Sequence, residues 1–145
     1  MKNDRCPIRA CRGFTLIELV LTVAVIAVLT GITIAGYSYQ VTKSRRADAK
    51  NALLDLAARE ERYFTSNNTY TNVAANLGYG ALPASVPGAG TTSYTINVTA
   101  FTATSFTAQA TRGTVQNNDG CGDYTIDDRG TQGNVNNTQT TATCW

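Results

Sequence analysis

A single carboxylate interrupts an apolar stretch near the start of the chain. Glu18 lies inside the segment from Phe14 to Ala35, and the part from Leu19 onward contains no charged residue. These 22 residues would form an α-helix about 33 Å long, close to the roughly 30 Å of a bilayer's hydrocarbon core. A carboxylate at mid-membrane costs on the order of 2.5 to 3.5 kcal/mol. We therefore expect Glu18 to have a function and a cationic partner.

The rest of the chain offers little catalytic chemistry. It contains no histidine, so a Ser-His-Asp or Cys-His arrangement cannot form. We expect no enzymatic activity, no catalytic residue and no cofactor. Four acidic residues could bind calcium, but their spacing fits no EF-hand loop, so we interpret them as turn residues and expect no metal site. They are Asp119, Asp123, Asp127 and Asp128.

One long helix is expected to carry Glu18. The apolar part, 14–37, is membrane-length, and an amphipathic continuation follows over 38–65. Apolar residues recur there at intervals of three, four and seven, which predicts one face packed against a sheet. They are Ala49, Ala52, Leu53, Leu56, Ala57, Tyr63 and Phe64.

A small head is expected after the helix. Residues 66–92 are rich in Asn, Gly, Thr and Pro and predict a long loop. Alternating apolar residues in 93–99, in 101–112 and around Tyr124 predict antiparallel strands within 93–128, and a short fourth strand precedes Cys144. We therefore predict an α+β fold, in which the helix packs on a small antiparallel sheet in a head over 66–145.

Three interpretations of the first 35 residues are open. The basic residues before Phe14 and the apolar run would suit a secretory signal peptide, but that leaves Glu18 unexplained, and the run exceeds the roughly 7 to 15 residues of a usual signal core. A plain membrane anchor, oriented by those basic residues, is the second. For the third, the sequence Gly-Phe-Thr-Leu-Ile-Glu-Leu from Gly13 to Leu19 strongly resembles the signature of the type IV pilin family.

The resemblance implies roles for three residues. Residues 1–13 would be a leader that a prepilin peptidase removes after Gly13, and Phe14 would become the methylated N-terminus. Glu18 would meet the N-terminal amine of a neighbouring subunit during assembly. At roughly 4 Å and an effective dielectric of about 20, such a pair is worth on the order of 4 kcal/mol before desolvation, which exceeds the insertion cost.

The resemblance also divides the four cysteines. Cys6 and Cys11 would leave with the leader, whereas Cys121 and Cys144 would be exported. We therefore predict one disulfide, Cys121 to Cys144, bounding the C-terminal region 121–144. Closing this loop would contribute roughly 3 kcal/mol in the chain-entropy model.

The C-terminal pattern resembles the PilE-like subgroup, many of whose members are minor subunits. It comprises Asp119-Gly120-Cys121-Gly122, Tyr124 to Asp127, Gly130 and Cys144-Trp145. The resemblance implies a structural, minor subunit of a bacterial type IV pilus. Its partners would be other pilin subunits, the prepilin peptidase and the inner-membrane assembly machinery. The chain would sit in the inner membrane with its N-terminus in the cytoplasm, and later in the extracellular pilus.

Two other functions stay open, a DNA-uptake pilin and a type II secretion pseudopilin. DNA binding is not favoured, because beyond the leader and Glu18 the chain carries eight basic and eight acidic side chains, so no overall field attracts nucleic acid. A basic cluster follows the apolar stretch, and we expect it to contact other subunits or lipid headgroups. It comprises Lys43, Arg45, Arg46 and Lys50. In the strand region only Arg112 and Arg129 are basic.

Overall fold

The computed structural model describes residues 13–86 and 91–145, except for the side chains of residues 32–36. The expected leader, with Cys6 and Cys11, lies outside the described residues apart from Gly13, and so do residues 87–90 of the expected loop. The chain divides into two compact units, 1–38 and 39–145.

A single helix, α1, runs from Leu16 to Asn67. Thr15 precedes its first turn, where the Thr15 carbonyl accepts hydrogen bonds from the amides of Glu18 and Leu19 at 3.1 and 3.2 Å. The helix ends where Asn68 adopts a left-handed conformation (φ 55°) and donates its amide to the Phe64 carbonyl, as asparagine often does at a helix C-terminus.

The large apolar side chains in the first part of α1 are solvent-exposed. From Leu16 to Leu29 their exposed fractions range from 52% to 81%. No helix formed by the described residues is both long enough and apolar enough to cross a membrane. The interval 14–37 includes residues 32–36, whose side chains are not described, so the span expected there stays a prediction.

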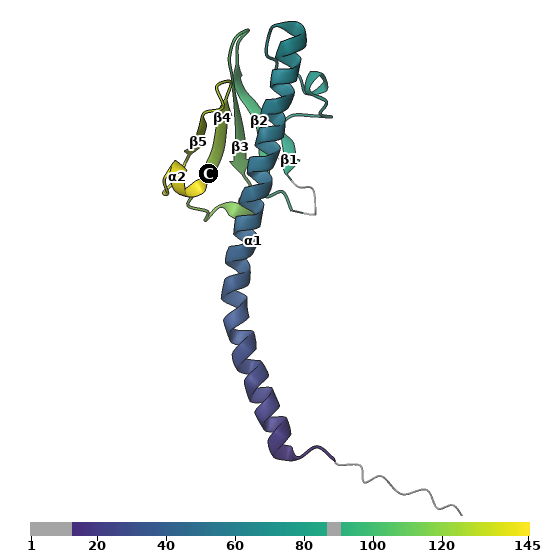
Figure 1. Ribbon diagram of the computed structural model, residues 1–145, viewed down its shortest axis with the longest axis vertical. Coiled ribbons are helices and arrows are strands. Elements are labelled where there is room, and N and C mark those ends of the chain that lie inside the picture. The colour runs from purple at the N-terminus through teal and green to yellow at the C-terminus, as the bar shows by residue number, and fades with distance from the viewer. Residues whose placement is uncertain (1–12, 87–90) are drawn as a thin grey trace, which may run out of the picture. The chain divides into compact units, whose positions relative to one another are not determined.

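Five antiparallel strands follow as a meander in the order β1-β2-β3-β4-β5. They are β1 (Ala84–Val86), β2 (Tyr94–Phe101), β3 (Phe106–Arg112), β4 (Asp123–Asp127) and β5 (Gln132–Val135). Two short 3-10 turns, η1 (Ala74–Leu77) and η2 (Thr114–Gln116), and a final turn α2 (Thr141–Cys144) complete the head. The sheet lies beside the later turns of α1 (Figure 1).

Alternation along the strands builds the core. Tyr94, Ile96 and Val98 of β2 are buried, and the intervening residues are partly exposed. The buried face of α1 meets this side of the sheet through Ala49, Leu53 and Leu56, all 0% exposed. A period of two in the strands and of 3.6 in the helix thus converge on one core, which confirms the predicted α+β class.

The sheet is longer than expected. β1 lies inside the interval predicted to be a loop, where Val86 pairs with Tyr94. β5 is the short strand expected before Cys144, but the residues directly before that cysteine form α2. β1 and β5 are the two edge strands and depend on a neighbouring strand, which explains why local sequence patterns signal them weakly.

Candidate functional site

The residues predicted to act at the N-terminus lie together at the start of α1. Gly13 and Phe14 precede the helix, and the Phe14 side chain is 78% exposed. Glu18 is exposed in the first turn. Its backbone amide contacts Thr15, but within the described residues its carboxylate makes no hydrogen bond or ion pair. The segment thus presents one unpaired acid among exposed apolar side chains.

The predicted cysteine pair forms a disulfide between the turn that precedes β4 and the end of α2. The Cα atoms of Cys121 and Cys144 are 5.5 Å apart, within the range that a disulfide requires. Gly122 follows Cys121 with φ +68°, and a Cβ there would lie 2.2 Å from the Val135 carbonyl oxygen. Only glycine fits this turn, which brings β5 against the disulfide.

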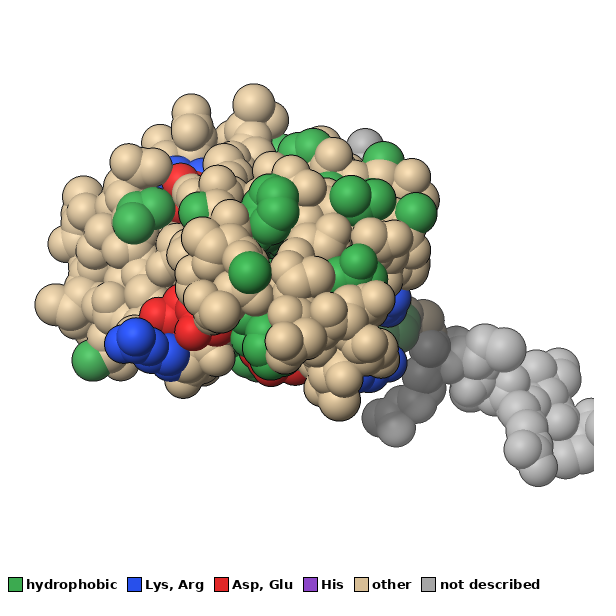
Figure 2. All heavy atoms as spheres, turned by 90° about the horizontal axis from the view of Figure 1, so that it is seen from above, with side chains coloured by type: hydrophobic (Ala, Val, Ile, Leu, Met, Phe, Trp, Pro, Cys, Tyr) green, Lys and Arg blue, Asp and Glu red, His purple; other side chains and the backbone are tan. Residues whose placement is uncertain are grey.

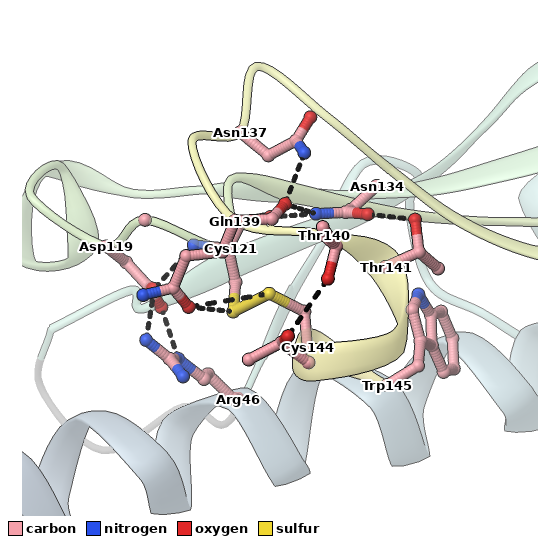
Figure 3. The surroundings of a disulfide bond; sticks show 12 residues. Arg46, Asp119, Cys121, Asn134, Asn137, Gln139, Thr140, Thr141, Cys144 and Trp145 are labelled. Carbon is pink, nitrogen blue, oxygen red and sulfur yellow. Dashed lines mark hydrogen bonds and ion pairs between the residues drawn. A yellow bond between two sulfur atoms is a disulfide. The ribbon is translucent and has the colours of Figure 1, made fainter.

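A buried ion pair, not predicted from the sequence, attaches the disulfide region to α1 (Figure 3). Arg46 donates to both oxygens of Asp119, at 2.8 Å from Nε and 2.5 Å from Nη2. The Asp119 side chain is 1% exposed. It also accepts hydrogen bonds from the Cys121 amide at 2.9 Å and the Tyr94 hydroxyl at 3.1 Å. One carboxylate therefore connects the helix, β2 and the disulfide.

Electrostatics favour the ionised form of Asp119. Burial by itself would raise the pKa of this carboxyl, but the hydrogen bond from Arg46 and the contacts of Cys121 and Tyr94 outweigh burial and lower the pKa. On the same pair, the pKa of Arg46 is raised, chiefly by the hydrogen bond to Asp119. Both shifts mean that the charged pair is stable in the folded head.

The remaining basic cluster also contacts the head. Lys50 donates to the Cys144 carbonyl at 3.1 Å, and Arg45 contacts Gln116 at 3.5 Å. Arg45, Arg46 and Lys50 thus make contacts within the chain, whereas Lys43 is exposed. The expectation that the cluster contacts other subunits or lipid stays a prediction. Figure 3 shows Arg46 on α1 beside the C-terminal part of the head.

One of the four C-terminal acids besides Asp119 is an ion-pair partner rather than a turn residue. Asp123 lies 3.6 Å from the Arg112 guanidinium and accepts the Arg112 amide at 3.0 Å. Asp127 does act in a turn, where it accepts the amides of Arg129 and Thr131 at 3.0 and 2.7 Å. No group of three or more potential metal ligands occurs in the described part of the chain.

The buried carboxyl of Glu60 was also not predicted from the sequence. Glu60 is 0% exposed, and one of its oxygens accepts the Thr71 amide at 3.2 Å while the other has no hydrogen-bond partner among the described residues. Burial raises the pKa of Glu60. The spacing of Leu53, Leu56 and Glu60 by three and four residues was the signal, because it places Glu60 on the buried face of α1.

Two family models match this chain. The model described as "Type IV minor pilin ComP, DNA uptake sequence receptor" matches residues 35–125, and the prokaryotic N-terminal methylation motif matches residues 8–34. The solved structure of the non-core minor pilin PilV of Neisseria meningitidis aligns over 70% of this chain and 94% of its own, with a TM-score of 0.52 and 19% identity. That similarity shows the fold alone.

Curated relatives are similar over part of their length. The type IV major pilin protein PilA of Myxococcus xanthus is 34% identical over 68 residues, which is 47% of this chain and 31% of the relative. The type IV wide pilus major component PilA4 of Thermus thermophilus is 36% identical over 81 residues, 54% of this chain and 62% of the relative. The chain thus spans less than two thirds of each. With the first family model covering more than half of its residues, the chain belongs to the type IV minor pilin ComP family.

Proposed function

We propose that this chain is a structural, minor subunit of a bacterial type IV pilus and assembles through α1. The observation that carries the proposal is the first part of α1, whose large apolar side chains from Leu16 to Leu29 are at least 52% exposed. Among them lies one acid, Glu18, which has no ionic partner in the described residues. An apolar helix surface of this length needs an apolar environment. A bundle of such helices from several subunits supplies one.

Glu18 would act as the docking charge. Its carboxylate would bind the N-terminal amine of Phe14 on a neighbouring subunit, after the peptide bond between Gly13 and Phe14 is cut. This pairing offsets the cost of placing a carboxylate in an apolar bundle and fixes the axial position of one subunit against the next. The exposure of both residues in the single chain supports this role, because both are accessible to a neighbour.

Processing and location follow from the same proposal. Type IV pilins are anchored in a membrane before assembly and are extracellular in the pilus. We place this chain in the inner membrane with a cytoplasmic N-terminus, where a prepilin peptidase cleaves after Gly13 and Phe14 is methylated. The assembly machinery of that membrane then incorporates it. The match of the N-terminal methylation motif to residues 8–34 supports this order.

Mass spectrometry of the chain isolated from sheared pili tests the proposal. We expect a first residue of N-methylated Phe14 and a disulfide between Cys121 and Cys144. A Gly13→Leu variant should remain in the membrane fraction at full length, while a Thr22→Ala variant serves as a control with the same processing as the wild type. A chain that begins at Met1 or at Gly36, or that is absent from sheared pili, would contradict the proposal.

DNA capture is a second candidate, and the family match favours it because the model names a DNA uptake sequence receptor. The charges of the head support it less. Arg112 is engaged with the carbonyls of Asp119 and Asn136, each at 2.8 Å. On the face in Figure 2, basic side chains show only in a few separate places, one of them against acidic side chains.

A gel-shift titration distinguishes the two functions. The full chain in detergent micelles would be titrated with duplex DNA at several salt concentrations. Because DNA binding depends on contacts to phosphates, a genuine complex weakens steeply as salt rises. A salt-sensitive shift at micromolar protein would establish DNA capture, and its absence would leave the structural role alone.

A further inference from the structure

A polar pocket lies beside the last turns of α1, where the segment after the helix folds back. Its volume is about 330 Å³, at the small end of known ligand pockets. Six polar or charged side chains line it together with Leu77 and Gly78. They are Arg59, Arg62, Tyr63, Ser66, Asn67 and Asn76. The lining of the pocket is therefore more polar than apolar.

One wall of the pocket is fixed by Arg59. Its guanidinium forms an ion pair with Asp55 at 2.7 Å and donates to the Leu77 carbonyl at 3.0 Å. It also lies 4.7 Å from the centre of the Tyr79 ring. With its charge offset by Asp55 and its position set by three contacts, Arg59 shapes the wall and holds η1 against the helix.

Another part of the lining is held through Asn76. Its side-chain amide donates to the Tyr63 hydroxyl at 3.3 Å and to the Thr71 hydroxyl at 3.4 Å. The Thr71 amide in turn donates to buried Glu60 at 3.2 Å. The pocket is therefore formed before any ligand arrives, which reduces the entropy cost of binding.

The charge of the pocket selects an anion. Among the described residues, no acidic side chain lines it. Arg62 is exposed, and its Nε donates to the Ala58 carbonyl at 3.3 Å, but in the part of the chain that the structure describes it belongs to no ion pair. Its terminal amines can therefore bind a ligand. A guanidinium can donate two parallel hydrogen bonds to a carboxylate or to a phosphate. The neutral hydrogen-bonding side chains beside Arg62 favour a ligand that carries hydroxyls as well as its anionic group.

We propose that this pocket binds an acidic monosaccharide unit. Arg62 would bind the sugar carboxylate. The neutral groups of Tyr63, Asn67 and Asn76 would exchange hydrogen bonds with the sugar hydroxyls, because each of these side chains has a donor or an acceptor that can serve a hydroxyl. The site would give a pilus subunit a contact to acidic polysaccharide at a surface, and it does not depend on how the subunit is assembled.

Nuclear magnetic resonance titration of the isotope-labelled full chain in detergent micelles tests the proposal. The probes are sodium D-glucuronate, the neutral sugar D-glucose and inorganic phosphate, all at equal ionic strength. We expect glucuronate to shift the side-chain amide signals of Asn67 and Asn76. Glucose should leave them in place, and phosphate should bind more weakly because it cannot use the hydroxyl-binding groups.

Two variants complete the test. Arg62→Gln should weaken glucuronate binding by about tenfold or more, since a charge-assisted hydrogen bond contributes roughly 1.5 to 3 kcal/mol. Arg129→Gln, an exposed arginine outside the pocket, should leave binding unchanged. Absence of a glucuronate effect, equal binding of phosphate, or equal loss in both variants would overturn the assignment. None of these outcomes bears on the presence of the chain in pili, so failure here is distinct from failure of the proposed function.

Discussion

The two stretches of α1 form the same secondary structure but differ in what covers their apolar side chains. Between Leu16 and Leu29 the large apolar residues are 52–81% exposed, whereas Leu53 and Leu56 are 0% exposed. The later stretch packs on a sheet made by its own chain. The earlier stretch has no such cover among the described residues of the single chain. Under the proposed function, lipids and other subunits supply that cover.

The charged residues of the two stretches also differ in whether they have a partner. Glu18 has no ionic partner in the described residues, while in the head Arg46 and Asp119 neutralise each other out of solvent. On the proposed function, the unpaired charge of Glu18 serves assembly, whereas the paired charges of Arg46 and Asp119 serve the fold. The following predictions test this division, beginning with the largest expected effect.

Replacing Asp119 with asparagine should lower the free energy of unfolding by about 3 to 5 kcal/mol, because Arg46 is left partly buried without its partner. Urea unfolding followed by the fluorescence of Trp145, the one tryptophan of the chain, measures this. The pKa of Asp119 is lowered in the fold. The stabilisation is therefore present above the unfolded pKa and is lost as pH falls through the lowered value, so wild type and D119N should converge in acid. A loss that persists unchanged in acid would contradict the account.

Removing the disulfide should have the next largest effect. A C121S/C144S variant, which lacks a bridge across a sequence separation of 23 residues, should lose roughly 3 kcal/mol in the chain-entropy model. Reduction of the wild type with dithiothreitol should give the same loss, and the double variant should not respond to the reductant. Equal unfolding midpoints for oxidised and reduced wild type would show that the ion pair alone holds this region.

Glu60→Gln should change the pH dependence of stability. Burial raises the pKa of Glu60 in the fold, so the folded wild type binds more protons than the unfolded chain. Its stability should fall as pH rises from the unfolded pKa through the raised folded pKa, by at most about 1.4 kcal/mol per pH unit. E60Q should lack this decline. Parallel curves for the two proteins would show that the buried carboxyl does not titrate in that window.

The smallest effect is expected for Asp55→Asn. The Asp55 and Arg59 side chains are 48% and 32% exposed, and exposed ion pairs contribute about 0.2 to 1 kcal/mol. Asp55 has the same charge as Asp119 and is also paired with an arginine of α1, so D55N is the matched control for D119N. Similar losses in the two variants, measured by the same urea titration, would remove the distinction between buried and exposed pairs.

Patterns with a short sequence range predicted the fold. The apolar residues that recur along α1 from Ala49 to Phe64 and the alternation in β2, β3 and β4 are patterns between near neighbours in sequence. They predict burial because each residue's burial follows from the period of its own element. β1 and β5 were harder to predict. The sequence of β1 has three residues, and β5 is Gln-Gly-Asn-Val, so their pairing depends on a neighbouring strand rather than on their own composition.

Apart from the disulfide of Cys121 and Cys144, the candidate site was indicated only by a local motif. Gly13, Phe14 and Glu18 lie in one continuous signature, and their roles remain proposals. The ion pair of Arg46 with Asp119 joins residues 73 positions apart, and a local pattern does not indicate which of several arginines meets which acid. The packing of α1 against the disulfide region determines which arginine pairs with Asp119, and the sequence pattern does not predict that packing.

Quantitative recovery of the chain in sheared pili tests the proposed docking role of Glu18 most directly. Glu18→Ala should reduce incorporation at least about tenfold relative to wild type, since the lost pair is worth on the order of 4 kcal/mol before desolvation. Leu19→Ala, which removes apolar surface from the next residue but no charge, should reduce it far less. Incorporation of E18A at the wild-type level, with both proteins processed equally, would contradict the account.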